Sequence, residues 1–411
     1  MRGLWRAALA VGLVLLLLYG GALLTVDRFG ASRAIVWLEA DTGDIDRFPS
    51  RTIPAGAQVW ELPAGEPLDL AEVWEVPDPE GLLDETGTVA FLIVQDGRLR
   101  YERYADGASG EELRTSFSVA KSLVSTLIGL AIEDGAIASL DEPITNFLPE
   151  LLEVDARYEA ITIRHLVTMS SGLRYVERFH PFSDDAQTYY GTDLRATGRS
   201  ARIDGEPGRQ FHYNNYNLLL EGMILERATG EQVSDFLARR LWQPMGAEAD
   251  ASFSLDSQAS GFEKMESGFN AIARDYVRFG RLIATGGRVD GRQVVPAQWI
   301  EVATSAELAG SAAGFYAAHW WTGTPDGVRF PEGHVLAAGN HGQYVYVAPD
   351  LDVVIVRLGD RYGTDDWPQI LTTIASQLEE ASDQSLTTNA WQPKRGGQGA
   401  RWAGLGSAGC C

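Results

Sequence analysis

A serine and a lysine three residues apart are the pair in this sequence whose chemistry is easiest to foresee. They are Ser118 and Lys121, and the 411-residue chain has only two other lysines, Lys264 and Lys394. The other cationic side chains apart from histidine are arginines, whose guanidinium stays protonated and cannot take a proton from a nucleophile. A lysine amine can take one once its ammonium form is destabilised. The pair therefore has the chemistry of a serine nucleophile with a lysine as its general base.

The spacing alone leaves two interpretations open. A Ser-x-x-Lys sequence also occurs where a serine caps a helix and a lysine reaches into solvent. The residues from 118 to 134 favour a site, because they are apolar on nearly every side of a helix, which predicts a buried helix. Residues three apart share a helix face, so we expect the Ser118 hydroxyl and the Lys121 amine within hydrogen-bond reach. The free NH groups at the helix N-terminus would also suit an oxyanion formed at Ser118.

A loop further along the chain carries a tyrosine and several amides. The residues from 207 to 217 include Tyr213 and Asn215 and run into an apolar helix that begins near Leu218. A tyrosine held near a cationic lysine ionises more easily and can move a proton between nucleophile and leaving group. The alternative is that Tyr213 is a core ring and that Asn214 or Asn215 caps the helix.

A glycine-containing motif opens a strand nearer the C-terminus. Residues 339–344 read Gly-Asn-His-Gly-Gln-Tyr. Glycine lets a substrate approach the backbone closely, so we expect Gly342 to make room and the NH of Gln343 to complete an oxyanion hole with the NH of Ser118. By itself the motif is equally a turn before a strand. His341 fits either a structural role or a contact with substrate.

Strand-like segments near both ends of the chain must position these motifs. Two β-rich runs joined by the hairpin signal Asp96-Gly97 precede the serine, and two more follow or overlap the glycine motif. Their ranges are 88–95, 98–104, 343–348 and 352–358. The part from about 139 to 310 is mainly helix-like, and residues 366–382 read as a closing amphipathic helix. We therefore predict an α+β domain over residues 86–382, in which helices flank an antiparallel sheet built from both ends of the domain.

The N-terminal residues 1–29 read as a membrane-directed segment. Arg2 and Arg6 precede an apolar run from 7 to 26, which is long enough to span a bilayer. The arginine flank favours an orientation in which the rest of the chain faces the periplasm, anchored in the inner membrane. The alternative is a signal peptide that is cleaved on secretion to the periplasm, because small residues follow the most apolar part of the run. Residues 30–85, dotted with prolines and aspartates, are expected to form a spacer with short strands.

Composition and the C-terminal end limit the classes of partner. Residues 383–411 are expected to form a disordered tail, because much of this stretch is rich in glycine, arginine and alanine without periodicity. Cys410 and Cys411 are the only cysteines, so no disulfide framework is expected. A formal net charge of −22 argues against nucleic-acid binding. The sequence has no Gly-rich phosphate loop and no paired-cysteine motif, and we expect neither a metal nor an organic cofactor. The oligomeric state stays open.

Taken in their order along the chain, these motifs resemble the serine β-lactamase and penicillin-recognising enzyme family, particularly its class C-like branch of esterases and aminohexanoate-oligomer hydrolases. The similarity covers about residues 86–380 and includes the run 161–173, which ends in Ser-Ser-Gly-Leu. It implies a β-lactamase/transpeptidase-like fold. It also implies that Ser118 is the acylated nucleophile, Lys121 its base and Tyr213 a second proton-transfer group.

Further residues indicate which branch of that family the chain resembles. The family usually offers Lys-Thr-Gly, whose cation helps to hold a substrate carboxylate, where this chain has Asn340, His341 and Gly342. An anionic β-lactam or peptide would then need an arginine from elsewhere. The oligomer hydrolases share the His-Gly-Gln pattern and use a tyrosine just past the Ser-Gly region in amide cleavage. Tyr175 lies in a similar place, unless it is an ordinary loop tyrosine. Asn215 matches the polar position two residues beyond the family's proton-transfer tyrosine.

The sequence therefore predicts a membrane-anchored, extracytoplasmic serine hydrolase that cleaves an ester or amide through an acyl-enzyme. Its expected partner is a small-molecule ester, amide or peptide substrate. One alternative is a DD-peptidase or β-lactamase acting on peptidoglycan-like or β-lactam substrates. Another is a catalytically silent homologue that binds a cell-wall fragment through the same cleft. The substrate stays open, because the loops between 175 and 205 shape the pocket.

Overall fold

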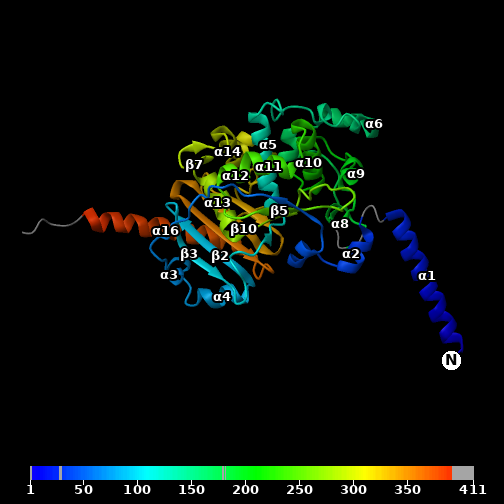
Figure 1. The fold of residues 1–411 in the computed structure, drawn as a ribbon, viewed down its shortest axis with the longest axis horizontal. Helices are drawn as coiled ribbons and strands as arrows, with labels where there is room; N and C mark the ends of the chain where they lie inside the picture. Colours follow the sequence, from blue (N-terminus) through cyan, green and yellow to red (C-terminus); the bar gives the residue numbers. More distant parts are fainter. Residues whose placement is uncertain (1, 27–29, 178–179, 181, 391–411) are drawn as a thin grey trace, which may run out of the picture.

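A five-stranded antiparallel sheet joins the two ends of the folded part of the chain. The computed structural model describes residues 2–26, 30–177, 180 and 182–390. The sheet has the strand order β3-β2-β11-β10-β9, and each neighbouring pair is antiparallel. The strands are β2 (Thr88–Gln95), β3 (Arg98–Tyr104), β9 (Val335–Gly339), β10 (Gln343–Ala348) and β11 (Val353–Gly359). N-terminal and C-terminal segments thus meet in one sheet, which confirms the predicted α+β architecture (Figure 1).

Helices cover both faces of this sheet. They are α5 (Val119–Glu133) and α13 (Ala273–Ala284) on one face and α16 (Trp367–Ala390) on the other. In β2, Leu92 and Val94 pack in the core shared with α5 and α13, whereas Phe91 and Ile93 pack with α16. Because successive side chains of a strand point to opposite faces, the apolar run of this central strand builds both cores at once.

A second, four-stranded sheet leads the chain into the serine. Its order is β1-β5-β6-β4. The strands are β1 (Ser50–Ile53), β4 (Arg114–Thr115), β5 (Ala251–Ser254) and β6 (Phe269–Ala271). The strand β1 comes from the segment that we expected to be a spacer, and the same segment buries Trp60 and Trp74 against the sheets. It also forms α2 (Ala31–Trp37), α3 (Leu70–Trp74) and α4 (Pro79–Glu85).

The middle of the chain is mainly helical, as predicted, although the short strands β5 to β8 also lie within it. Such short strands carry too few residues for a period-two pattern to stand out. The hairpin strands are β7 (Arg288–Val289) and β8 (Arg292–Gln293). The helices are α6 (Leu151–Val154), α7 (Ile163–Val167), α8 (Asp184–Tyr190), α9 (Leu194–Arg199), α10 (Asn215–Thr229), α11 (Val233–Leu237), α12 (Gln243–Met245), α14 (Ala297–Thr304) and α15 (Ala306–Ala309). A π-helical turn, Ala238–Trp242, joins α11 to α12.

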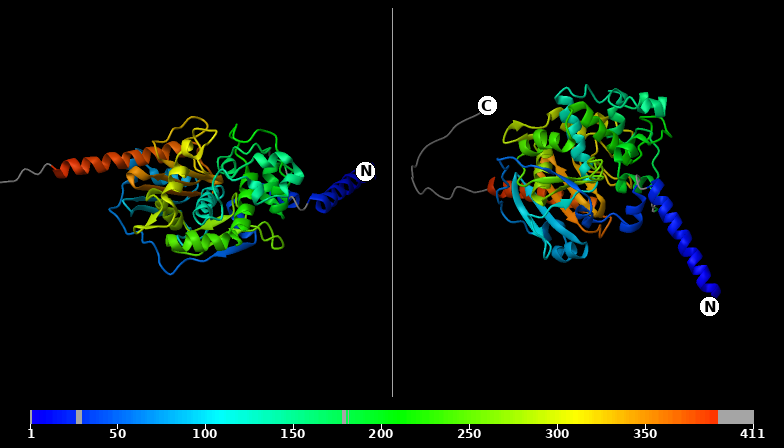
Figure 2. Two further views of the ribbon diagram at one scale, coloured as in Figure 1. Left: turned by 90° about the horizontal axis from the view of Figure 1, so that it is seen from above. Right: turned by 45° about the vertical axis from the view of Figure 1, so that its right-hand side comes forward.

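Each end of the described chain is a helix. The helix α1 (Arg2–Val26) projects away from the body in all three views of the ribbon (Figures 1 and 2). Its stretch Gly3–Gly21 is long and apolar enough to cross a membrane and is not buried by the rest of the protein. The closing helix α16 continues to Ala390, past the predicted end at 382. Most of the predicted tail, with Cys410 and Cys411, lies outside the described residues.

Candidate active site

A sharp turn between β4 and α5 places Ser118. The NH of Ser116 donates to the carbonyl of Phe269 at 2.8 Å, which extends the β4 to β6 pairing up to the turn. Phe117 then adopts a left-handed backbone with φ 44°, a conformation that bulky residues rarely adopt. Its buried ring packs 5.3 Å from the ring of His341 and 6.4 Å from that of Tyr189. These contacts hold the turn that presents Ser118 at the start of α5.

The structure brings Ser118 and Lys121 into direct contact. The Nζ atom of Lys121 lies 2.8 Å from the Oγ atom of Ser118 and donates to the carbonyl oxygen of Glu266 at 2.9 Å. Lys121 is 1% exposed, so its amine has these acceptors in place of water. The Ser118 side chain makes no capping hydrogen bond to α5. The geometry therefore excludes the alternative of a capping serine with a solvated lysine.

Tyr213 adjoins the amine of Lys121. The Nζ atom of Lys121 lies 5.0 Å from the centroid of the Tyr213 ring. That ring stacks on Trp321 with centroids 5.8 Å apart. The next residue, Asn214, caps α10 by accepting from the NH of Tyr216 at 2.9 Å, and its amide donates to the carbonyl of Leu173. The cap that we considered as an alternative role for this loop is thus present, and it fixes the residue that follows Tyr213.

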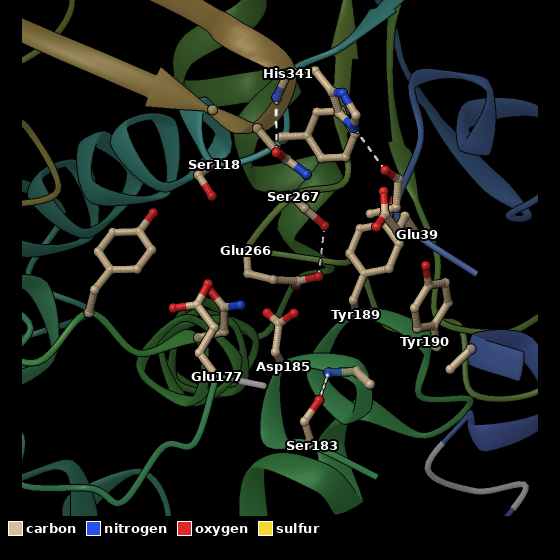
Figure 3. Close-up of a pocket in the computed structure, with 18 of the residues that line it drawn as sticks. Glu39, Ser118, Glu177, Ser183, Asp185, Tyr189, Tyr190, Glu266, Ser267 and His341 are labelled. Carbon is tan, nitrogen blue, oxygen red and sulfur yellow. Dashed lines mark hydrogen bonds between the residues drawn. The ribbon is translucent and has the colours of Figure 1, made fainter. Parts of the chain in front are cut away.

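Ser118 opens into a cavity of about 1060 Å³. Figure 3 shows Ser118 on one side of this cavity, with Glu177, Asp185 and Glu266 across from it. Five of the predicted site residues line the cavity: Ser118, Tyr175, Tyr213, Asn215 and His341. Lys121 lies behind Ser118. Gly342 and Gln343 are not among the lining residues.

Gln343 and Gly342 hold the sheet together at the end of the cavity. The Gln343 side-chain amide donates to the carbonyl of Gly359 at 2.6 Å, and the NH of Gly359 donates to the Gln343 Oε1 atom at 3.2 Å. Gly342 has φ 77°, and a Cβ atom there would lie 2.0 Å from the Arg357 guanidinium. The glycine that we expected to admit a substrate therefore makes room for an arginine of the neighbouring strand.

Gly339 is the glycine that approaches the serine. A Cβ atom on Gly339 would lie 2.3 Å from the Ser116 carbonyl oxygen and 3.1 Å from the Ser118 nitrogen. Gly339 and Asn340 both line the cavity. This contact was not predicted because the small residues of β9 give a weak strand signal, so that strand was not recognised in the sequence. The sequence feature that could have indicated the contact is Gly339 itself, the first glycine of the 339–344 motif.

His341 joins the cavity to the N-terminal segment. Its Nε2 atom lies 2.8 Å from the carbonyl oxygen of Ala40. Its ring lies between the rings of Phe117 and Tyr362, and the Tyr362 ring is nearly parallel to it at 6.4 Å. The residue thus makes structural contacts while it also lines the cavity. Both roles considered for it remain compatible with its position.

Tyr175 and Asn215 form a hydrogen-bonded pair in the cavity wall. The Asn215 amide donates to the Tyr175 hydroxyl at 2.8 Å, and that hydroxyl donates to Asp185 at 3.0 Å. Burial and the neighbouring Asp185 carboxylate raise the pKa of the Tyr175 hydroxyl well above its ordinary value, so it stays protonated. Among the described residues, nothing donates to the buried Oδ1 atom of Asn215. The two hydrogen bonds therefore fix the positions of Tyr175 and Asn215 in the cavity wall.

A buried ion pair forms another part of the wall. The Lys264 ammonium donates to the Glu266 Oε1 atom at 2.9 Å, and the Ser267 hydroxyl donates to the same oxygen at 2.8 Å. Burial lowers the pKa of Lys264, and the Glu266 carboxylate counteracts that shift. The Glu266 Oε2 atom is buried without a partner among the described residues, and Glu266 lines the cavity. Neither residue was predicted to line the site: Lys264 stood out in the sequence only because lysine is scarce, and Glu266 was not singled out.

The described residues that line the cavity include more acidic than basic side chains. The carboxylates come from Glu39, Glu177, Asp185 and Glu266. Among the lining residues that the structure describes, Arg361 is the one arginine, and its guanidinium also donates to the carbonyl of Glu85 at 3.0 Å. Within the described residues, no group of three or more His, Cys, Asp or Glu side chains is arranged to hold a metal ion.

Comparisons with known proteins agree with this fold. The beta-lactamase family model matches residues 80–379. The 6-aminohexanoate-dimer hydrolase of Paenarthrobacter ureafaciens is 30% identical over 319 residues, covering 71% of this chain and 76% of the relative. Penicillin-binding protein 4* of Bacillus subtilis is 27% identical over 170 residues, covering 39% of this chain and 36% of the relative.

Solved structures show the same fold at lower identity. A Bacillus anthracis protein assigned as a 6-aminohexanoate-dimer hydrolase superposes with a TM-score of 0.70 at 23% identity, covering 83% of this chain and 92% of that one. A penicillin-binding protein homologue from Caulobacter crescentus superposes with a TM-score of 0.58 at 16% identity, covering 78% of this chain and 99% of that one. With a family match over most of the chain and a β-lactamase/transpeptidase-like fold, this chain belongs to the beta-lactamase family.

Proposed function

We propose that this protein is a serine hydrolase that cleaves an ester or an amide through an acyl-enzyme on Ser118. The observation that carries the proposal is the buried Lys121 amine 2.8 Å from a Ser118 hydroxyl that is free of any capping role and opens into a cavity. Membership of the beta-lactamase family supports it, as does the similarity to a relative named for the hydrolysis of an amino-acid dimer.

The contacts of Lys121 suit a base. A neutral amine has two N–H bonds and one lone pair, and the Glu266 carbonyl accepts from one N–H. The lone pair can then accept the Ser118 proton as the Oγ atom attacks the substrate carbonyl. In the collapse of the tetrahedral intermediate, the bond to the leaving oxygen or nitrogen breaks and that atom takes a proton, which Tyr213 passes on from Lys121. Water then attacks the acyl carbon, gives a proton back through the same groups, and releases Ser118 and a carboxylic acid.

The developing oxyanion needs two fixed donors. The first is the NH of Ser118 at the N-terminal end of α5, where helix NH groups lack internal acceptors. Gln343 was expected to supply the second. The close approach of Gly339 to the Ser118 nitrogen favours the NH of Asn340, which follows Gly339 at the cavity wall. In this proposal, Gln343 and Gly342 keep the strands in place.

The charge of the cavity favours a substrate that carries an ammonium group. Carboxylates in a partly enclosed site attract cations and repel anions, and Glu266 has one oxygen without a partner among the described residues. Arg361 is partly committed to the Glu85 carbonyl. An anionic β-lactam or a peptide carboxylate is therefore a poorer match than an ester or amide with a terminal amine.

Matched substrates test the reaction and the charge preference separately. We expect the p-nitrophenyl ester of 6-aminohexanoate to be hydrolysed with a higher kcat/KM than the hexanoate ester, and the p-nitrophenyl monoester of adipate to be slowest. Mass spectrometry after rapid quenching should find the acyl group on Ser118. Efficient acylation by a fluorescent penicillin with negligible ester turnover would show a DD-peptidase or β-lactamase instead. Absence of any acylation would show a silent binding homologue.

We also propose that α1 remains as a membrane anchor and that the body lies outside the cytoplasm. The support is the length and apolar composition of Gly3–Gly21 and the arginines that flank it. Intact-mass measurement of the protein isolated from membranes should give the full chain. A mass that lacks the first twenty or so residues would instead show a cleaved signal peptide.

A further inference from the structure

The segment that follows α1 forms one rim of the cavity. Ala34, Ile35, Leu38, Glu39 and Ala40 all line it, although they precede the residues 80–379 that match the family model. Part of the wall around Ser118 is thus built from residues that the family model does not include. Figure 3 shows Glu39 at the edge of the cavity, beside Tyr189.

This rim is fixed to the body. Ala31 and Ala34 of α2 are buried, and α2 packs against α8. The Tyr190 hydroxyl donates to the Leu38 carbonyl at 3.0 Å, and His341 holds the Ala40 carbonyl. Figure 1 shows α2 close to α8 and to the C-terminal end of α1. The position of α2 therefore fixes where the cavity opens relative to α1.

The outer face of α2 is apolar and has no partner within the described chain. Ile35 is 41% exposed, Val36 is 65% exposed and Leu38 is 68% exposed. Leu38 holds this position with a left-handed backbone, φ 66°, which is unfavourable for leucine. At the cavity mouth, Tyr362 is a further exposed apolar side chain. A cluster of exposed apolar residues of this kind marks a surface that contacts another apolar phase.

The short link between α1 and α2 indicates what covers the apolar face of α2. The helix α1 ends at Val26 and α2 begins at Ala31, and five residue steps reach at most about 18 Å. If α1 crosses a bilayer, its apolar run ends just before Asp27 and Arg28, so α2 begins within that distance of the hydrocarbon boundary. Apolar side chains on a short helix at this depth insert into the headgroup region.

We propose that the exposed face of α2 rests in the membrane surface, so that the cavity mouth faces the bilayer and takes amphiphilic esters or amides that reside there. The membrane contact rests on α1 being retained, and the substrate class rests on the proposed hydrolase function. The contact is apolar. With a net charge of −22 and Glu39 at the rim, anionic lipid does not strengthen it.

Site-specific fluorescence in vesicles tests the contact itself. The full-length chain with Cys410→Ser and Cys411→Ser carries a single new cysteine, Val36→Cys, labelled with an environment-sensitive dye and reconstituted in phosphatidylcholine vesicles. The matched control is Leu308→Cys, which is 54% exposed on α15 and is not among the cavity-lining residues. We expect spin-labelled lipid to quench the dye at position 36 at least about threefold more than at position 308, and iodide in the water phase to do the reverse.

Two results would overturn the membrane contact. One is equal access of iodide to both positions, which would mean that the mouth opens to water. The other is protection of position 36 from both quenchers together with formation of a disulfide dimer when the unlabelled Val36→Cys protein is oxidised, which would show that a second copy of the chain covers α2. Neither result depends on enzymatic activity, so failure of the contact is distinguishable from failure of the hydrolase function.

A kinetic comparison tests the substrate class. Val36 is not among the cavity-lining residues, so we expect Val36→Glu to leave the hydrolysis of dissolved p-nitrophenyl acetate unchanged. The same variant should hydrolyse p-nitrophenyl palmitate in phosphatidylcholine vesicles about tenfold more slowly, since a charge replaces an apolar contact. Leu308→Glu should change neither rate. Equal rates of Val36→Glu and the unmodified protein on the vesicle substrate would overturn delivery from the membrane.

Discussion

At the scale of single residues, lysine is scarce, and both lysines in the described part of the chain are buried against a specific partner. Lys121 contacts the Ser118 hydroxyl, and Lys264 is paired with Glu266. The two lysines meet at one residue, because the backbone carbonyl of Glu266 accepts from Lys121 while its carboxylate accepts from Lys264. Glu266 therefore helps to fix the positions of both amines.

Substitutions of Lys121 test whether its amine accepts the proton of Ser118. We expect Lys121→Ala to lower the rate of Ser118 acylation at least ~100-fold, since a general base typically contributes that much or more. Lys121→Arg keeps a long basic side chain at this position but cannot accept a proton, so it should be nearly as slow. Labelling by a fluorophosphonate measures the acylation rate, and circular dichroism checks that both variants are folded. Labelling of Lys121→Ala at the rate of the unmodified protein would remove Lys121 from the mechanism.

At the scale of elements, the site depends on the close packing of β9 against the turn before α5. Gly339 has no side chain, so the backbone of β9 can approach the backbone of the turn before α5. At other glycines, such as Gly314, nothing lies within 4 Å of the position that a Cβ atom would take. The α5 helix supplies the serine, and the β9 edge supplies the opposite wall. A small displacement between these two elements changes the distance between the proposed oxyanion donors, to which such sites are sensitive.

A single methyl group tests this packing. Gly339→Ala would bring a Cβ atom to 2.3 Å from the Ser116 carbonyl oxygen, so the strand or the turn must shift. We expect kcat to fall at least tenfold with a loss of about 1–3 kcal/mol in the free energy of unfolding. The control is Gly314→Ala, where nothing lies within 4 Å of the added atom and both quantities should stay unchanged. Full activity of Gly339→Ala would contradict a catalytic role for this approach.

The sequence predicted the central elements better than the cavity walls. The strands β2, β3, β10 and β11 and the helix α5 were all predicted, because long apolar runs and a hairpin turn mark them locally. The strand β9 was missed, and with it Gly339, because alanines and glycine carry little strand signal. The lining residues Glu39, Asp185 and Glu266 come together only through long-range packing. No spacing in the sequence indicates that they share a wall.

At the scale of the whole molecule, many ionisable side chains are buried. Burial is the main cause of a raised pKa at twelve of the fourteen tyrosines. Tyr346 on the central sheet is an example, with its pKa raised to about 12. A group whose pKa is higher in the folded state favours folding while it is protonated in both states, and that contribution is lost as pH rises through the folded value.

The protein should therefore unfold cooperatively in alkali. We expect the free energy of unfolding to fall above pH ~10, where tyrosines of the unfolded chain ionise, and tyrosinate absorbance to rise together with the loss of far-ultraviolet circular dichroism. The burial of Lys264 acts in the opposite direction, because its lowered pKa makes stability rise with pH up to its unfolded value, but it is one group against many. Gradual tyrosine ionisation in a folded protein would contradict this expectation.

Glu266 is held at two points, because its backbone carbonyl accepts from Lys121 and its carboxylate accepts from Lys264. Its carbonyl oxygen touches the Lys121 amine and its carboxylate faces the cavity, so one residue spans the distance between the base and the substrate wall. Under the proposed function, a substrate cation that draws the Glu266 side chain forward would pull on the same backbone that positions the Lys121 amine. Selection for a new substrate at this position will therefore change affinity and turnover together, and variants that improve one independently of the other must arise elsewhere in the wall.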